Sequence, residues 1–257
     1  MSRDRSMTKE AWIRARYAWR SQVLKLKERR LGIPAVGSGA FSFSELPGLL
    51  RKPDPMCFDI GACDGIQSKA ILDAVPGATL HCFEPEPRNL WKLRRSLAGT
   101  DAHIHEIVLT DNDGPVLFWR SGGAPEGRED DIPEGYAGSG SLSPPRLHKD
   151  LVPWVTFDES MTVTGFTLDT WCQQNGVSEI DFIWMDVQGA EHLVFAGGER
   201  MLRSTRYIHT EYSNLPLYQG QVPLVDLLRQ LGEWDVLWRT NTDALLRNRR
   251  LDEGGSS

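Results

Sequence analysis

Apolar residues recur with two different periods along most of the chain. Short apolar runs are typical of strands, and longer segments with apolar residues three or four positions apart are typical of helices. In chain order, these elements are predicted at residues 56–60, 67–75, 78–83, 87–98, 103–109, 168–175, 180–185, 191–202, 207–212, 223–231, 234–238 and 244–247. Strands that alternate with helices predict a doubly wound α/β fold with a mostly parallel sheet.

The N-terminal region follows another pattern. Apolar residues recur at helical spacing among lysines and arginines from residue 8 to residue 31, and Gly32 and Pro34 end the pattern. We expect a basic amphipathic helix that packs on the domain or on a second subunit, which would make a homo-oligomer. A membrane surface or an anionic partner is the alternative. Residues 1–40 are therefore assigned to this helix and a connector, and residues 41–257 to one domain.

Residues 120–153 interrupt the alternation of strands and helices. The strand at 103–109 is followed by a turn signal at 111–114, so residues 116–119 are predicted to be its hairpin partner. The segment after them is rich in glycine, proline, serine and acidic residues, and is too polar for a core. Such an irregular insertion is a lid or substrate-binding loop, or else disordered. Its serines are expected to border the active site: Ser139, Ser141 and Ser143.

Charge and composition narrow the class of protein. Residues 1–30 carry ten lysines or arginines against three acids, a charge of +7, and the remainder carries −13. An acidic main domain argues against nucleic acid as a partner. No apolar run approaches about 18 residues, and no secretory signal is visible, so we expect no membrane span and a cytoplasmic location. The four cysteines show no C-x-x-C pairing and are interpreted as buried apolar residues.

The loop at residues 59–65 carries the first candidate chemistry. It follows a strand and has the spacing D-x-G-x-x-x-G, with Gly61 and Gly65 forming a tight turn. A dinucleotide fingerprint would instead read G-x-G-x-x-G and would surround a pyrophosphate with backbone N–H groups. The carboxylates of Asp59 and Asp64 would repel a pyrophosphate, whereas S-adenosylmethionine has no phosphate and carries an ammonium and a sulfonium. The loop therefore favours a cationic cofactor.

A second carboxylate completes the predicted cofactor site. Glu84 ends the next strand, 25 positions after Asp59, where folds of this kind bind the hydroxyls of an adenosine ribose. S-adenosylmethionine is therefore the predicted cofactor. The candidate cofactor-binding residues are Asp59, Gly61, Gly65, Glu84, Asp111 and Asp186.

Polar side chains also gather at the ends of two later strands. The strand at 180–185 is followed by Asp186, Gln188 and Glu191. On the strand at 207–212, His209 and Glu211 share one face because side chains alternate with period two. Since the carboxyl ends of parallel strands meet at one edge of the sheet, Asp186 and Glu211 are expected to converge.

These motifs together resemble the FkbM family of S-adenosylmethionine-dependent methyltransferases. The resemblance covers about residues 56–215 and is carried by five parts of the sequence: residues 58–62, 83–85, 167–171 and 180–191, and Glu211. It implies a class I, Rossmann-like fold and methyl transfer to an oxygen of a sugar, a glycan or a small natural product. A nicotinamide-dependent oxidoreductase and a non-catalytic binding protein are the alternatives.

Methyl transfer to an alcohol requires a group that takes the proton. Asp186 and His209 are the candidate bases, and Glu211 is expected to orient the base or to bind the acceptor. A divalent ion held by Asp186, Glu211 and Glu191 would also activate an alcohol, but it is not favoured, and no metal ligand is assigned.

Overall fold

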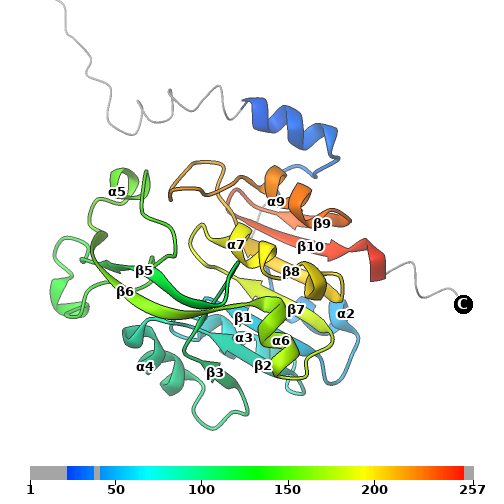
Figure 1. Cartoon of the computed structure of the whole chain (residues 1–257), viewed down its shortest axis with the longest axis horizontal. Coiled ribbons are helices and arrows are strands. Elements are labelled where there is room, and N and C mark those ends of the chain that lie inside the picture. Colours follow the sequence, from blue (N-terminus) through cyan, green and yellow to red (C-terminus); the bar gives the residue numbers. More distant parts are fainter. Residues whose placement is uncertain (1–21, 38–40, 252–257) are drawn as a thin grey trace, which may run out of the picture.

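The computed structural model describes residues 22–37 and 41–251 (Figure 1). Within these residues, one sheet has seven strands in the order β3-β2-β1-β7-β8-β10-β9. Their bounds are β1 (Met56–Ile60), β2 (Thr79–Phe83), β3 (His103–His105), β7 (Ile180–Met185), β8 (Thr205–Glu211), β9 (Trp234–Arg239) and β10 (Asp243–Asn248). From β3 to β8 neighbouring strands are parallel, and β10 is antiparallel to both of its neighbours. The predicted mostly parallel α/β sheet is confirmed.

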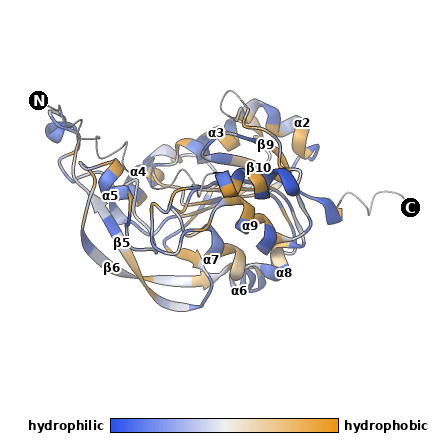
Figure 2. Cartoon of the chain, turned by 90° about the horizontal axis from the view of Figure 1, so that it is seen from above, coloured by the Kyte–Doolittle hydropathy of each residue, from blue (hydrophilic) through white to orange (hydrophobic). Residues whose placement is uncertain are grey.

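Helices cover both faces of this sheet, as predicted. One face packs against η1 (Phe43–Glu45), α2 (Leu46–Leu50), α3 (Ile66–Ala74) and α4 (Pro87–Ser96), and the other against α6 (Leu168–Gln174), α7 (Glu191–Ala196), α8 (Glu199–Leu202) and α9 (Leu224–Leu231). Figure 2 shows α2 and α3 opposite α6, α7 and α8. Successive strand residues point to opposite faces of the sheet. Cys57 packs in the core beneath α2, α3 and α4, and Phe58 packs in the core beneath α6 to α9.

The helix predicted at 191–202 is two helices in the structure. It breaks between α7 and α8 at Gly197 and Gly198. A Cβ atom at residue 197 would lie 2.0 Å from the carbonyl oxygen of Thr110, so the backbone approaches a neighbouring strand too closely for any side chain. Close packing at this glycine therefore overrides the helical pattern.

A second, smaller sheet lies beside the first. It has the order β4-β6-β5, formed by β4 (Val108–Thr110), β5 (Gly114–Gly122) and β6 (Thr156–Thr167). The predicted hairpin between residues 103–109 and 116–119 is wrong, because 103–109 divides into β3 and β4, and β5 pairs with β6. The predicted insertion contains the end of β5, η2 (Glu129–Asp131) and α5 (His148–Leu151). We call β5 and β6 the ribbon (Figure 1).

The described part of the N-terminal region packs on the domain. Residues 22–30 are helical, and residues 8–21 of the predicted helix lie outside the described residues. Leu24 is buried, and the buried Glu28 forms an ion pair with Arg239 at the end of β9, at 3.1 Å. The Nε atom of Arg239 also donates to the carbonyl oxygen of Pro34 at 2.7 Å. The short helix η3 (Arg249–Leu251) ends the described chain.

No helix in the described ranges combines the length and apolar composition that crossing a membrane would require.

Candidate functional site

A cavity of about 250 Å³ opens at the carboxyl ends of β1, β2 and β7. Each of these strand ends contributes a predicted site residue to its lining: Gly61, Glu84 and Asp186. The insertion between β5 and β6 contributes residues 136–138, 140 and 142. The cavity therefore lies at the edge of the sheet where open α/β folds bind their ligands.

The two glycines of the loop after β1 have different roles. Gly61 has a φ of +86°, and a Cβ atom there would lie 1.9 Å from the carbonyl oxygen of Asp186. In addition, the Asp186 N–H donates to the carbonyl oxygen of Ile60 at 3.0 Å. Gly65 does not line the cavity; its Cβ would meet Leu93 at 2.9 Å. Gly61 thus lets the loop approach β7, and Gly65 lets it approach α4.

Glu84 is a buried carboxylate at the wall of the cavity. Its Oε2 atom accepts from the Cys63 N–H at 2.9 Å, and its Oε1 atom accepts from the Glu86 N–H at 2.8 Å. Burial raises the pKa of Glu84 to about 7. Each carboxylate oxygen has two lone pairs, so the group can also accept hydrogen bonds from ligand hydroxyls.

Two predicted cofactor ligands do not reach the cavity. Asp59 is fully buried and accepts a hydrogen bond from the Ser68 hydroxyl, because strand alternation directs its side chain toward α3. Burial raises its pKa to about 7, and its Oδ1 atom has no hydrogen-bond partner among the described residues. Asp111 is exposed on the turn after β4, which belongs to the smaller sheet. Neither residue lines the cavity.

The predicted convergence of Asp186 and Glu211 is present in the structure. Between them lies the Gln188 side chain, whose Nε2 atom donates to Asp186 Oδ1 at 2.6 Å and to Glu211 Oε2 at 2.9 Å. The Gln188 Oε1 atom accepts from the Tyr218 hydroxyl at 3.0 Å. The sequence identifies Gln188 only as an amide at a strand end, and Tyr218 carries no signal, since its contact spans 30 positions.

The Glu211 carboxyl group of this network favours its protonated form. Burial, and then the negative charge of Asp186, raises the pKa of Glu211 far above its usual range. The two half-buried carboxyl groups share the Gln188 amide, so Glu211 favours its protonated form. Glu191 is occupied elsewhere, accepting the Gly189 N–H at 3.0 Å. Among the described residues, no group of three or more His, Cys, Asp or Glu side chains is arranged to hold a metal ion.

His209 is not placed to take a proton from a molecule in the cavity. Its ring stacks on Trp184, with the centroids 3.8 Å apart and the planes 3° from parallel, and it does not line the cavity. Burial lowers its pKa to about 4. Although it shares a face with Glu211, it lies two residues before the end of β8, about 6 to 7 Å further from the edge of the sheet.

The insertion forms one wall of the cavity. All three predicted border serines are buried, and two of them connect this wall to Gln188 or to its partner Tyr218. Ser141 donates from its hydroxyl to the Gln188 carbonyl oxygen at 2.8 Å, and the Ser139 carbonyl oxygen accepts from the Tyr218 hydroxyl at 2.9 Å. Ser143 is buried and donates its N–H to the Ser141 hydroxyl at 3.0 Å. These contacts place part of the insertion at the cavity, and its role as a lid or substrate-binding loop stays a prediction.

The lining of the cavity contains both acidic and apolar side chains. It includes the carboxylates of Asp64, Glu84 and Asp186, and among the described residues no lysine, arginine or histidine. Ile107, Leu109 and Phe118 form an apolar part. A ligand that carries positive charge and a flat apolar ring system matches this donor set, whereas a pyrophosphate does not.

Glu191 and His209 should affect stability with opposite dependence on pH. Burial raises the pKa of Glu191 to about 7, so its ionisation destabilises the folded state as the pH rises from about 4.5 to 7. The Glu191→Gln variant should therefore gain about 3 kcal/mol relative to the wild type across this window. Because the pKa of His209 is lowered, the wild type gains stability as the pH rises from about 4 to 6.5. The stability of His209→Phe relative to the wild type should therefore fall over the same rise in pH.

Urea unfolding of both variants and the wild type at several pH values measures these differences. Comparison with the wild type cancels the contributions of all other titrating groups. If the stabilities of the two variants relative to the wild type changed with pH in the same direction, the assigned pKa directions of Glu191 and His209 would be wrong.

Comparison with known proteins assigns the chain to a family. The model of the methyltransferase FkbM domain matches residues 59–241. The 2-O-methyltransferase NoeI of Sinorhizobium fredii is 38% identical over 232 residues, which cover 88% of this chain and 93% of the relative.

Two solved methyltransferases are more distantly similar. The O-methyltransferase from Bacillus cereus, in complex with SAH, is 12% identical with a TM-score of 0.43 and 88% coverage of both chains. Precorrin-6y C5,15-methyltransferase from Geobacter metallireducens is 14% identical with a TM-score of 0.41, covering 82% of this chain and 91% of that one. The matching domain and the 38% identical relative establish the family. The chain belongs to the FkbM methyltransferase family.

Proposed function

We propose that this protein transfers the methyl group of S-adenosylmethionine to a hydroxyl oxygen of a sugar, a glycan or a small natural product. One observation carries the proposal: an acidic cavity at the carboxyl ends of β1, β2 and β7 places Glu84 and Asp186 in the same lining. The name of the relative, a 2-O-methyltransferase, supports oxygen as the accepting atom. No step of the proposal uses a metal ion.

The lining suggests how the cofactor would be held. Glu84 would accept the ribose hydroxyls, and the apolar side chains of Leu109 and Phe118 would contact the adenine base. Asp64 and Asp186 would balance the positive charge of the cofactor. When bound, S-adenosylmethionine supplies an electrophilic methyl group. A nicotinamide dinucleotide, the alternative cofactor, would place its pyrophosphate among these same carboxylates.

The network around Gln188 suggests how the acceptor would be activated. Asp186 would accept the proton of the acceptor hydroxyl, and its orientation is fixed by the Gln188 amide at 2.6 Å. Protonated Glu211 can donate a hydrogen bond to an acceptor oxygen. Positioning of this kind can lower a barrier by about 7 to 11 kcal/mol. A base in hydrogen-bonding reach adds a factor of about 10² to 10⁴ in rate.

Replacement of Glu84 tests the cofactor site. The Glu84→Gln variant should bind S-adenosylhomocysteine about 10- to 150-fold more weakly, because charge-assisted hydrogen bonds to the ribose contribute about 1.5 to 3 kcal/mol. Titration calorimetry measures the dissociation constant. The control is Glu106→Gln, an exposed carboxylate paired with Arg94 outside the cavity, which should bind as the wild type does. Failure of the wild-type protein to bind either form of the cofactor would refute the proposed function.

A further inference from the structure

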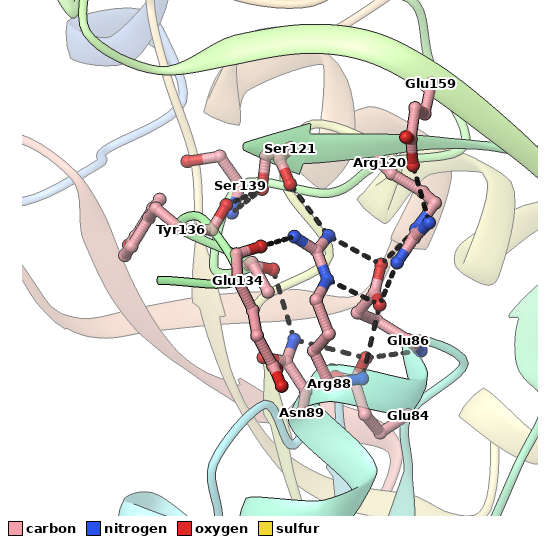
Figure 3. Close-up of polar contacts among 11 residues, drawn as sticks. Glu84, Glu86, Arg88, Asn89, Arg120, Ser121, Glu134, Tyr136, Ser139 and Glu159 are labelled. Atoms are coloured by element: carbon pink, nitrogen blue, oxygen red, sulfur yellow. Dashed lines mark hydrogen bonds and ion pairs between the residues drawn. The ribbon is translucent and has the colours of Figure 1, made fainter. Parts of the chain in front are cut away.

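Glu86 joins the two sheets of the protein through a pair of guanidinium groups. Its side chain is only 1% exposed. Arg88 donates to it from Nε and Nη2, both at 2.9 Å, and Arg120 donates to it from Nε and Nη2, also both at 2.9 Å (Figure 3). We call Glu86, Arg88 and Arg120 the carboxylate clamp. Since Arg88 lies on α4 and Arg120 on β5, one carboxylate links the main sheet to the ribbon.

The first turn of α4 also holds the wall of the cofactor cavity. Arg88 donates to the carbonyl oxygens of Glu134 and Ser121, both at 2.8 Å. The Asn89 side chain donates to the carbonyl oxygen of Ala137 at 3.1 Å. We call residues 134–140 the roof segment, and its residues 136–138 and 140 line the cavity. Its backbone therefore depends on side chains of α4 for its position.

The same turn of α4 is connected to the predicted ribose ligand. The Glu86 N–H donates to Glu84 Oε1 at 2.8 Å, and the Asn89 amide reaches the same oxygen at 3.4 Å. Although burial opposes its ionisation, hydrogen bonds from Arg88 and Arg120 lower the pKa of Glu86 to about 2. The clamp is therefore charged at neutral pH, and its two arginines balance one buried negative charge.

Arg120 differs from Arg88 in one informative respect. Its guanidinium donates to Glu86 and, at 2.6 Å, to the exposed Glu159. Among the described residues, no hydrogen bond joins this guanidinium to the roof segment. Arg120 can therefore act on the roof segment through Glu86 and Arg88, or through its neighbour Ser121. The Ser121 hydroxyl donates to the Tyr136 carbonyl oxygen at 2.8 Å and accepts from the Ser139 N–H at 3.0 Å. Charge-assisted bidentate bonds fix the geometry of both partners, which gives such an effect a physical route.

We propose that the carboxylate clamp consists of positioning residues that hold the roof segment over the cofactor cavity and thereby set the affinity for S-adenosylmethionine. This inference rests on the proposed function. Loss of the clamp loosens the roof segment, whereas Gln188 keeps its own hydrogen bonds to Ser141 and Tyr218. Only the bond from the Tyr218 hydroxyl to the Ser139 carbonyl oxygen joins this network to the described roof segment directly, so the affinity for the cofactor should change more than kcat.

The Arg120→Met variant tests this inference. We expect its dissociation constant for S-adenosylhomocysteine, and its KM for S-adenosylmethionine, to rise about 2- to 30-fold. Its kcat at saturating cofactor should stay within about twofold of the wild type, which a general loss of folding would not produce. The Arg88→Met variant should show at least the same loss of affinity. In the double variant the dissociation constant should rise by less than the product of the two single fold-increases, because both arginines act through Glu86.

Two further variants make the outcome decisive. Glu159→Gln removes the exposed partner of Arg120, leaves the clamp intact and should bind the cofactor as the wild type does. Arg120→Lys keeps the charge but loses the bidentate geometry, so its affinity should fall between those of the wild type and Arg120→Met. If Arg120→Met does not fold, unchanged affinity in Arg120→Lys overturns the inference. Unchanged affinity in a folded Arg120→Met, or a loss of kcat alone, also overturns it. A wild-type protein that does not bind the cofactor would instead refute the proposed function.

Discussion

Replacing Asp186 with asparagine should lower kcat by about 10²- to 10⁴-fold, which is the usual contribution of a general base. The asparagine side chain can still accept the hydrogen bond that Gln188 donates at 2.6 Å, so the geometry of the network should survive. What is lost is the ability to take a proton from the acceptor hydroxyl. Steady-state rates at saturating cofactor and acceptor measure the effect. Calorimetry with S-adenosylhomocysteine shows whether cofactor binding has changed as well.

Glu211→Gln is the matched control for this experiment. Because Glu211 holds a proton, a carboxamide resembles its native form, and its kcat should fall by less than about tenfold, the loss of one hydrogen bond. Equal losses in Asp186→Asn and Glu211→Gln would contradict the assignment of Asp186 as the base. A loss confined to cofactor affinity in Asp186→Asn would instead assign this carboxylate to the binding of the cofactor's positive charge.

Replacing Arg239 with methionine should lower the free energy of unfolding by about 3 to 5 kcal/mol. This arginine is 8% exposed and pairs with Glu28, which is 7% exposed, so removing it leaves a buried carboxylate without its cation. The carbonyl oxygen of Pro34 also loses its donor. Urea unfolding followed by circular dichroism measures the change.

The double variant Glu28→Leu and Arg239→Met tests whether the loss of stability comes from the unpaired carboxylate of Glu28. Apolar side chains in place of both charges remove the unpaired carboxylate, and much of the lost stability should return. If the double variant is as unstable as the sum of the two single variants, the N-terminal helix is held by contacts other than this ion pair. The exposed pair of Arg229 and Asp226 offers a comparison, since its removal should cost less than about 1 kcal/mol.

The sequence predicts the main sheet well because its strands are buried on both faces. The strand expected at 180–185 is β7 with the same bounds, and the apolar runs at 56–60 and 78–83 locate β1 and β2 within one residue. The strand β6 escapes prediction because the ribbon projects beyond the main core. Most of its twelve residues are exposed or half-buried, so its sequence lacks the run of apolar residues that identifies a buried strand.

The predicted carboxylates that line the cavity are those that directly follow the last residue of a strand. Glu84 follows β2 and Asp186 follows β7, and both line the cavity. Asp59 precedes the last residue of β1, and its side chain is directed toward α3. One residue changes the face of a strand side chain, and two residues move it by about 7 Å. Sequence periodicity locates a strand end less sharply than that, which is why Asp59 and His209 were misplaced.

The clamp has no counterpart in the sequence pattern. Glu86 and Arg120 are 34 positions apart, and each resembles an ordinary surface residue at the end of an element. Their partnership exists only because the ribbon folds back over α4. Contacts of this kind depend on tertiary structure, and neither hydrophobic periodicity nor motif spacing reports them.

The same link limits how segments of this protein can be exchanged with those of relatives. Because β5 carries Arg120 to the Glu86 carboxylate at the N-terminus of α4, which packs on the main sheet, the ribbon is not an independent module. A hybrid whose grafted β5 has an apolar residue at this position would bury the Glu86 charge with one guanidinium instead of two. Grafts that begin after Arg120 avoid this defect, so the cavity wall can be exchanged while the Arg120–Glu86 pair stays in place.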